Sequence, residues 1–209
     1  MPTETVNKIL GKNVRLAVVM GPSFAHELAL HKRTAFDVFA THKLYIAVRK
    51  LFVNDQVTLS EKFDYKGMQL IAIMKNIIAF GMGLLEGCGF GENGKAVFAT
   101  LMIDETKNLL TNLVGTDEAL WEISGIGDIF LTSLGSSSRN LKCGRMMGQG
   151  LSKDEIIKEL GCLPEAFYSI CAMDEMARTH DIDIPFTCAL AEVIRNNSEE
   201  TRSVFCEDI

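Results

Sequence analysis

A nearly unbroken apolar run from Leu70 to Leu85 constrains the fold of this chain more than any other segment. Lys75 and Asn76 interrupt it, and its length falls short of the roughly 20 apolar residues that a membrane-spanning helix needs. We therefore expect no membrane span. The run predicts instead a helix over residues 68–86 that lies buried in the core of a helical domain.

Before this helix the chain alternates between β-rich and helical segments. Strands are expected at residues 14–20, 34–40 and 56–61, with helices at 23–29 and 42–53 between them. The order β-α-β-α-β is typical of a parallel sheet. Strand signals fade near residue 65, so we predict a first domain over residues 1–65 and a second over residues 66–209.

The second domain is expected to be all-helical, which makes the chain an α+β protein by content. Ser152 and Glu155 form the pattern of a capping box, in which each side chain bonds to the backbone of the other residue at a helix start. The tail after Asn196 is polar, and we expect it to be frayed. Helices are predicted at residues 68–86, 93–113, 117–123, 138–148, 152–160, 164–179 and 186–197.

Composition argues against several classes of function. The 209 residues are 47% hydrophobic and 23% charged, as in an ordinary globular protein, and the net charge is −6. Because there is no basic cluster, we expect no nucleic-acid or anionic-membrane partner. The six cysteines contain no CxxC pair and the four histidines show no metal-ligand spacing, so we expect no metal site. The lack of a signal-peptide pattern favours a cytoplasmic location with reduced thiols.

Residues 124–140 carry the densest group of polar candidates. A glycine turn leads into Asp128, and a run of serines ending in Ser138 leads into Arg139 and Asn140. Hydroxyl, guanidinium and amide groups at a helix start are suited to bind a phosphate group. The structural alternatives are that Ser138 caps a helix whose Arg and Asn face solvent, and that Asp128 is itself an N-cap.

Lys75 is the strongest candidate for proton transfer. Its ammonium is poorly solvated among apolar neighbours, which favours exchange of a proton near neutral pH. The alternative is a lysine whose stem packs on the bundle while its ammonium reaches water. Gly21 and Ser23 lie between a strand and a helix, where α/β sheets bind ligands, although an ordinary turn also explains them. Glu165 begins a helix, where the helix dipole by itself favours a carboxylate.

These motifs occur in one order that resembles a known family. Their order and spacing are similar to those of the bacterial-type NAD(P)-dependent glycerol-3-phosphate dehydrogenases, from the middle of the family sequence to its C-terminus. The likeness covers nearly all of this chain but only the later part of a typical family member. The motifs are, in order, residues 21–25, 75–76, 89–93, 125–128, 138–140, 148–150 and Glu165.

The resemblance implies an oxidoreductase of glycerophospholipid and carbohydrate metabolism, which interconverts sn-glycerol 3-phosphate and dihydroxyacetone phosphate with NAD or NADP. Lys75 matches the proton acceptor at the C2 hydroxyl, and Asp128 belongs to the same catalytic group. The implied fold is the end of a Rossmann-like α/β domain followed by an all-helical substrate domain, with the active site in the cleft between them. Substrate-binding positions match Gly21, Ser23, Lys75, Asp128, Ser138, Arg139 and Asn140. Positions near the cofactor match Ala25, Arg139, Leu163 and Glu165.

Three departures from the family pattern bear on activity. Residues 71–73 are Ile-Ala-Ile where the family has small residues, and residues 163–166 are Leu-Pro-Glu-Ala instead of Val-Val-Glu-Gly. No Gly-x-Gly-x-x-Gly follows a first strand, so the glycine loop that seats the cofactor pyrophosphate has no counterpart. We therefore expect a truncated or split form of the enzyme.

Two alternative functions remain open. One is a non-catalytic remnant or partner subunit that binds a small phosphorylated ligand. The other is a different dehydrogenase that acts on a hydroxyacid, although the serine-rich Arg-Asn segment favours a phosphorylated substrate. Because the sheet lacks the strands that precede it in the family, its edge is expected to be unpaired. We therefore expect a homodimer, or a partner chain that supplies the missing cofactor half.

Overall fold

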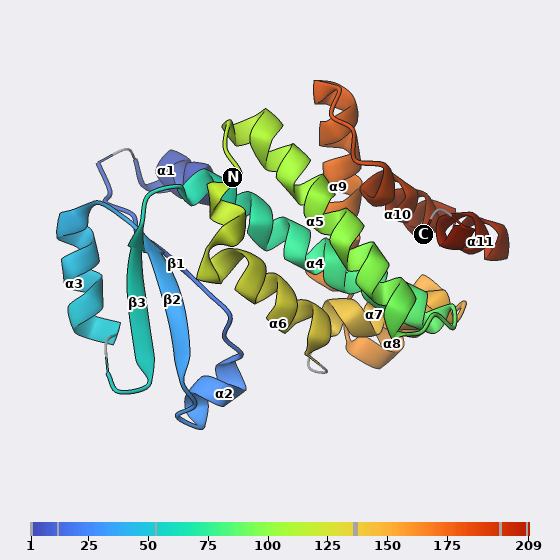
Figure 1. Ribbon diagram of the computed structural model, residues 1–209, viewed down its shortest axis with the longest axis horizontal. Helices are drawn as coiled ribbons and strands as arrows, with labels where there is room; N and C mark the ends of the chain where they lie inside the picture. Colours follow the sequence, from blue (N-terminus) through green and yellow to red (C-terminus); the bar gives the residue numbers. More distant parts are fainter. Residues whose placement is uncertain (1, 12, 53, 136–137, 197, 208) are drawn as a thin grey trace. The chain divides into compact units, whose positions relative to one another are not determined.

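The computed structural model describes the chain except residues 1, 12, 53, 136–137, 197 and 208. The chain forms two compact units, whose elements are labelled in Figure 1. The first comprises Met1–Ala72 and Thr116–Leu131, and the second comprises Ile73–Gly115 and Thr132–Ile209. The domain boundary predicted after residue 65 lies at the start of helix α4, Tyr65–Gly87, and stays a prediction.

The first unit is built on a three-stranded sheet in the order β1-β2-β3. β2 and β3 are parallel, with Thr34 opposite Val57, as the sequence predicts. β1 is antiparallel to β2, with Val19 opposite Val38, so the prediction of a parallel sheet is wrong for this pair. The strands are β1 (Val18–Met20), β2 (Thr34–Phe39) and β3 (Val57–Lys62), and the helices around them are α1 (Pro2–Leu10), α2 (Ala25–Ala29) and α3 (His42–Phe52).

The connection from β1 to β2 explains the antiparallel pair. Its helix α2 has 5 residues, too few to carry the chain back along the sheet to the start of a parallel strand. The chain instead reverses at His31, whose φ is 54°, and returns beside β1. The connection from β2 to β3 contains the 11-residue α3, which is long enough for a parallel crossover.

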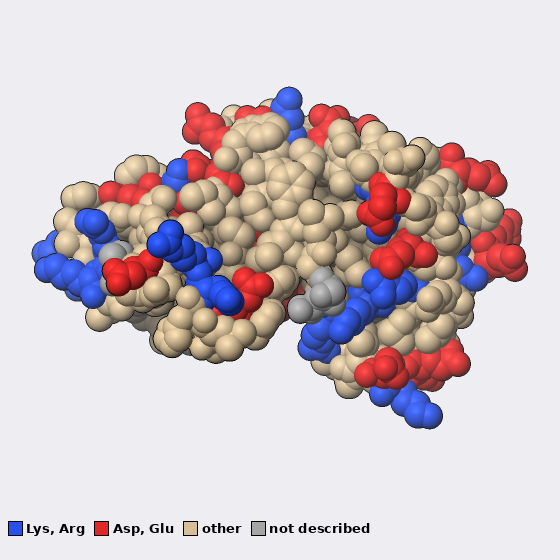
Figure 2. Space-filling model, turned by 60° about the horizontal axis from the view of Figure 1, so that its bottom comes forward, with Lys and Arg blue, Asp and Glu red and all other residues tan. Residues whose placement is uncertain are grey.

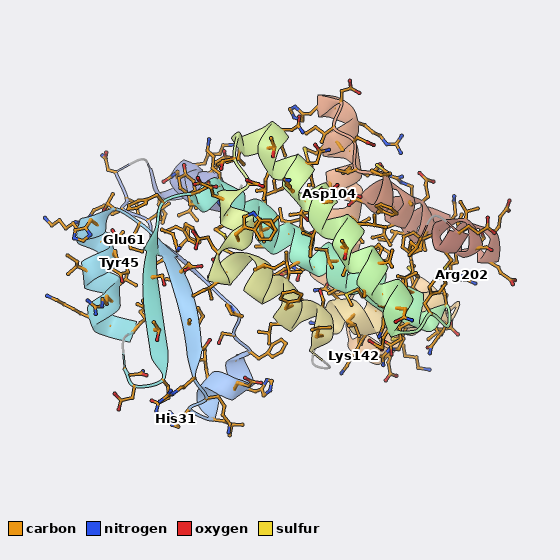
Figure 3. All side chains as sticks on the ribbon, in the orientation of Figure 1. His31, Tyr45, Glu61, Asp104, Lys142 and Arg202 are labelled. Carbon is orange, nitrogen blue, oxygen red and sulfur yellow. The ribbon has the colours of Figure 1, made fainter. Side chains whose placement is uncertain are left out.

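The core of the first unit lies between the sheet and α3. Val38, Val57 and Leu59 are buried, and Tyr45 and Val48 of α3 pack against them. The Tyr45 hydroxyl donates to the Leu59 carbonyl at 3.1 Å, which ties α3 to β3; Figure 3 labels Tyr45 at this position. Apolar burial and one directed hydrogen bond therefore fix the helix on the sheet.

The segment that follows residue 116 completes the first unit with two irregular turns. Residues Glu118–Trp121 form a 3-10 helix, η1, where a regular helix over 117–123 was predicted. Residues Ile123–Gly127 form a π-helical turn, η2, which leads into α6, Asp128–Leu134. An ion pair between Lys62 and Glu122 joins this segment to the end of β3.

The second unit is all-helical among the residues that the structure describes, as predicted. Its central helix is α4, in which Met74, Ile77 and Phe80 are fully buried. By length and composition α4 is apolar enough to cross a membrane, but 83% of its most apolar window is buried inside the protein, as in a core helix. The other helices are α5 (Glu92–Val114), α7 (Arg139–Gly148), α8 (Lys153–Leu160), α9 (Glu165–His180), α10 (Pro185–Asn196) and α11 (Glu199–Glu207).

The C-terminal helix corrects the sequence analysis, which expected a frayed tail after Asn196. Helix α11 forms there because its Phe205 is buried in the second unit, where its ring meets the edge of Phe98 with a centroid distance of 5.8 Å. Burial of one aromatic side chain offsets the polar composition of this helix. The capping box of Ser152 and Glu155 at the start of α8 is confirmed.

Helices α4 and α7 approach so closely that their backbones touch. A methyl group on Gly144 would overlap the carbonyl oxygen of Phe80, and one on Gly83 would overlap that of Leu141. The absence of side chains at these points therefore sets the distance between the two helices. The glycines of this contact are spaced four residues apart on each helix, Gly83 and Gly87 on α4 and Gly144 and Gly148 on α7.

We predict that Gly144→Ala destabilises the protein by at least about 2 kcal/mol, because the added methyl group would force the helices apart. Helix propensity alone would give the opposite sign, a gain of up to about 1 kcal/mol. The matched control is Gly91→Ala, since Gly91 has open space around it and a negative φ. Urea unfolding of both variants checks the prediction, and equal midpoints would contradict it.

The carboxylate of Glu105 joins α5 to the start of α10. It is buried and accepts the backbone N–H of Phe186 at 2.9 Å and that of Thr187 at 3.0 Å. These two N–H groups lie in the first turn of α10, where no intrahelical partner exists. Burial raises the pKa of the Glu105 carboxyl from its ordinary value of 4.5, while the hydrogen bonds from Thr187 and Phe186 oppose the rise.

A raised carboxyl pKa means that the folded state binds this proton more tightly than the unfolded state. The contribution of the protonated Glu105 carboxyl to stability is therefore complete below pH 4.5, and it is lost as pH rises through the folded-state pKa. We predict that the free energy of unfolding of the wild type, relative to that of Glu105→Gln, falls as pH rises from 4.5 through the folded-state pKa. Urea titrations at several pH values measure it, and a constant difference would contradict the assignment.

Candidate functional site

Two turns that carry predicted site residues lie together in the first unit. Gly21 directly follows β1, and a methyl group there would overlap the Ala35 carbonyl oxygen, so this close approach requires glycine. The Thr34 hydroxyl donates to the Pro22 carbonyl at 3.0 Å and holds the turn to β2. A Cβ atom on Gly127 would lie 3.5 Å from Pro22 Cγ. The glycine turn before Asp128 therefore lies close to the turn after β1.

Ser23 and Asp128 are the polar groups of these two turns. The Ser23 hydroxyl is buried and has no hydrogen-bond partner among the described residues. Asp128 is 4% exposed and is the first residue of α6, where the helix dipole favours a negative charge. Ala25, the remaining predicted residue of this unit, is the first residue of α2. The first unit thus brings a buried hydroxyl and a buried carboxylate onto adjoining turns.

In the second unit, a chain of side-chain amides joins three helices. Asn140 at the start of α7 donates from Nδ2 to Asn76 Oδ1 on α4 at 3.0 Å. Asn76 donates from Nδ2 to Glu165 Oε2 at the start of α9 at 3.2 Å. The backbone N–H of Ala166 donates to Asn140 Oδ1 at 3.1 Å and closes the ring. Two predicted site residues, Asn140 and Glu165, are therefore brought together through Asn76.

Asn76 is a residue of this ring to which the sequence analysis assigned no binding role. The available signal was its position beside Lys75, since an amide inside an otherwise apolar helix needs hydrogen-bond partners when it is buried. Lys75 itself is half-buried on α4, whereas its neighbours Met74 and Ile77 are fully buried. Lys75 is therefore less enclosed than the apolar residues beside it on α4.

Ser138 and Arg139 begin α7 and have well-defined contacts. The Ser138 Oγ accepts the backbone N–H of Leu141 at 3.3 Å, which confirms the N-cap alternative for this serine. Arg139 donates from Nη2 to the carbonyl oxygens of Leu160 at 3.3 Å and Cys162 at 3.2 Å. Ser136 and Ser137, which belong to the predicted serine run, fall outside the described residues.

The contacts of Arg139 tie the start of α7 to the loop between α8 and α9. This loop carries Leu163 and leads to Glu165, both predicted to lie near a cofactor. The second unit therefore gathers one set of predicted residues around the start of α7, and the first unit gathers another around the end of β1. The set in the second unit is Lys75, Ser138, Arg139, Asn140, Leu163 and Glu165, and the set in the first is Gly21, Ser23, Ala25 and Asp128.

The Gly-x-Gly-x-x-Gly spacing that binds a cofactor pyrophosphate is not found after a strand of the first unit. The spacing Gly-x-Gly-x-x-Gly does occur at residues 89–94, but there it joins the helices α4 and α5 instead of a strand and a helix. The turn after β1 leads into α2, whose 5 residues form too short a helix for a strong N-terminal dipole.

Other ligand classes find little support in the part of the chain that the structure describes. No group of three or more His, Cys, Asp or Glu side chains suited to hold a metal ion occurs in it. On the face drawn in Figure 2, Lys and Arg side chains form a few separate groups with Asp and Glu side chains beside them. The polar groups around the start of α7 therefore remain the best candidate site.

Comparison with known proteins identifies the family. A family profile described as the C-terminus of NAD-dependent glycerol-3-phosphate dehydrogenase matches residues 64–204. The chain is 33% identical over 184 residues to "Glycerol-3-phosphate dehydrogenase [NAD(P)+]" of Lacticaseibacillus casei, covering 88% of this chain and 52% of the relative. It is 34% identical over 182 residues to the protein of the same name from Shouchella clausii, covering 87% and 54%. The chain thus spans about half the length of these curated relatives.

Solved structures agree with this result. The crystal structure of glycerol-3-phosphate dehydrogenase from Coxiella burnetii matches with a TM-score of 0.91 and 26% identity, over 99% of this chain and 63% of that chain. The enzyme of Saccharomyces cerevisiae shares the fold, with a TM-score of 0.82 at 22% identity, over 98% and 62%. Because the profile covers most of the chain, this protein belongs to the NAD-dependent glycerol-3-phosphate dehydrogenase family and carries its C-terminal region.

Proposed function

We propose that this chain is the substrate-binding half of a glycerol-3-phosphate dehydrogenase, acting in the cytoplasm on sn-glycerol 3-phosphate and dihydroxyacetone phosphate. The observation that carries the proposal is the ring of Asn76, Asn140 and Glu165, which fixes the start of α7 beside the lysine of α4. This arrangement supplies donors for a phosphate group and a base for a hydroxyl group in one region of the second unit.

The phosphate group is assigned to the start of α7. The N-terminus of this 10-residue helix presents backbone N–H groups and the positive end of its dipole. Ser138 accepts a backbone N–H through its oxygen and keeps its own O–H as a donor. The contacts of Arg139 with Leu160 and Cys162 use Nη2, and its Nε and Nη1 have no hydrogen bond to the described residues, so these two nitrogens are proposed to bind the anion.

The proton is assigned to Lys75. In oxidation of glycerol 3-phosphate, its neutral amine takes the proton of the C2 hydroxyl; in reduction, its ammonium returns that proton to the carbonyl oxygen. Asp128 is proposed to accept a hydrogen bond from a substrate hydroxyl, and the buried Ser23 hydroxyl would gain in the ligand the partner that the described residues do not give it. NAD or NADP is the hydride carrier of this family's reaction.

We further propose that the cofactor half is supplied from outside the described residues, by a partner chain or a second copy of this chain. The absence of a Gly-x-Gly-x-x-Gly spacing after a strand of the first unit favours a second function, namely a non-catalytic subunit that binds a small phosphorylated ligand through the same α7 site. The two proposals share the phosphate site and differ in turnover.

We predict that Ser138→Ala weakens binding of glycerol 3-phosphate about tenfold, the loss expected for one hydrogen bond to a charged group. Binding of glycerol, which lacks the phosphate, should be unchanged. Lys107→Met, at an exposed position of α5, is the control for nonspecific effects on charge. Calorimetric titration of each variant checks this prediction, and failure of the wild type to bind glycerol 3-phosphate would contradict both functions.

Turnover separates the two functions. With dihydroxyacetone phosphate and NADH or NADPH, loss of cofactor absorbance that falls about 100-fold or more in Lys75→Met would support the dehydrogenase. The control Lys107→Met should keep wild-type turnover. Binding without turnover in the wild type would support the non-catalytic subunit.

The sheet provides a separate test of the proposed partner. β1 pairs with β2 and has no second neighbour among the described strands, so it is an open edge. We predict self-association through β1, which Val18→Lys should abolish and Thr58→Lys, on the exposed surface of β3, should not. Sedimentation velocity at several concentrations measures this, and a monomeric wild type at high concentration would refute it.

A further inference from the structure

A buried carboxylate on the sheet lies outside every role assigned so far. Asp37 is in the middle of β2 and is 0% exposed. No cation pairs with it among the residues that the structure describes. Transfer of a carboxylate into a protein interior is costly unless hydrogen bonds compensate, so its few contacts are informative.

Both contacts of Asp37 are to one residue, Ser124. Its Oδ2 accepts the Ser124 backbone N–H at 2.8 Å and the Ser124 hydroxyl at 2.6 Å. Its Oδ1 is buried and has no partner in the described part of the chain. Ser124 is 1% exposed, so these are buried, charge-assisted hydrogen bonds, which are shorter and stronger than neutral ones.

The bonded serine lies in the turn that sets the position of Asp128. Ser124 belongs to η2, Ile123–Gly127, and Asp128 follows directly as the first residue of α6. A methyl group on Gly125 would overlap the Ala119 carbonyl oxygen, so the turn is tightly packed against η1. Asp37 is the point at which this turn is fastened to the sheet by a side chain.

We propose that Asp37 is a positioning residue: through Ser124 it holds the η2 turn and thereby sets the place of Asp128 and of the adjoining turn after β1. The inference rests on the proposed function, because Asp128 is there a ligand of the substrate hydroxyl. It assigns to a buried sheet residue a part in substrate affinity, although Asp37 does not touch the substrate.

The free-energy cost of burying the Asp37 carboxylate supports a positioning role. Apolar packing alone can hold a turn against a sheet, and a neutral side chain can accept one N–H bond without burying a charge. Here a carboxylate is buried, one of its oxygens accepts both donors of Ser124, and the other has no partner among the described residues. The backbone and the side chain of Ser124 are thus both fixed, which restricts rotation of the turn as well as its distance from β2.

The test compares Asp37→Asn in two backgrounds, the wild type and Asp128→Asn. The amide keeps the shape and an acceptor but removes the charge that strengthens both bonds. If Asp37 acts through Asp128, we expect glycerol 3-phosphate to bind about fivefold more weakly in the first background and less than about twofold more weakly in the second. Asp55→Asn, an exposed position, is the matched control and should leave affinity unchanged. Calorimetric titration gives each value.

A merely structural role predicts the same loss in both backgrounds, and this result, or no loss in either, would overturn the proposal. Where Asp37→Asn does not fold, Ser124→Ala replaces it, since that change removes the hydroxyl bond and keeps the backbone bond.

Failure of the proposed function is distinguishable from failure of this inference. If the wild type does not bind glycerol 3-phosphate, amide hydrogen exchange still reports on the turn. Exchange at residues 123–128 that is about tenfold faster in Asp37→Asn, with β2 and β3 unchanged, would retain Asp37 as the residue that positions the turn. Unchanged exchange at these residues would reject it.

Discussion

The contact between the backbones of α4 and α7 is the constraint on which the second unit depends. Because glycines face each other there, the spacing of the two helices is set by peptide groups, which have no alternative rotamers. Gly144 lies about one helical turn from Asn140, so the same contact fixes the distance across which Asn140 reaches Asn76. The hydrogen-bonded ring of Asn76, Asn140 and Glu165 can form with good geometry because the distance between α4 and α7 is fixed.

In the first unit, hydrogen bonds to a buried carboxylate take the place of this backbone contact. Its mixed sheet places β2 between two partners, and Asp37 on that strand fastens the turn that leads to Asp128. The close approach of this turn to Pro22 then brings the predicted residues of the two turns near one another. In the second unit the contact between α4 and α7, and in the first unit the bonds between Asp37 and Ser124, thus fix the position of nearby predicted site residues.

Regular elements were predictable because their signals are local. The apolar run of α4, the capping box of α8 and the parallel pairing of β2 and β3 all follow from periodicity or short motifs. The antiparallel pairing of β1 was missed because it depends on where the chain reverses, at His31. Helix α11 was missed because one buried ring, Phe205, outweighs a polar composition. Helices α1 and α6 were also not assigned.

The site was predictable to the extent that its residues lie in motifs. Asn140 and Glu165 were expected and are joined, but their link through Asn76 depends on helix packing that no single segment encodes. Asp37 was invisible for a similar reason, since an aspartate in a β-rich run gives no sign that its partner lies 87 residues away. The facing pairs of glycines on α4 and α7 were a readable signal, because small residues four apart on two helices indicate close contact.

The ring of amides also has a direction. Every nitrogen in it donates and every oxygen accepts, so the ring closes in one sense only, from Ala166 through Asn140 and Asn76 to Glu165. An amide and a carboxylate differ by one atom, yet the exchange turns a donor into an acceptor. Hydrolysis of the Asn76 side chain would therefore set two carboxylates against each other at the start of α9. Replacement of this one amide by a carboxylate would therefore break the ring at Asn76.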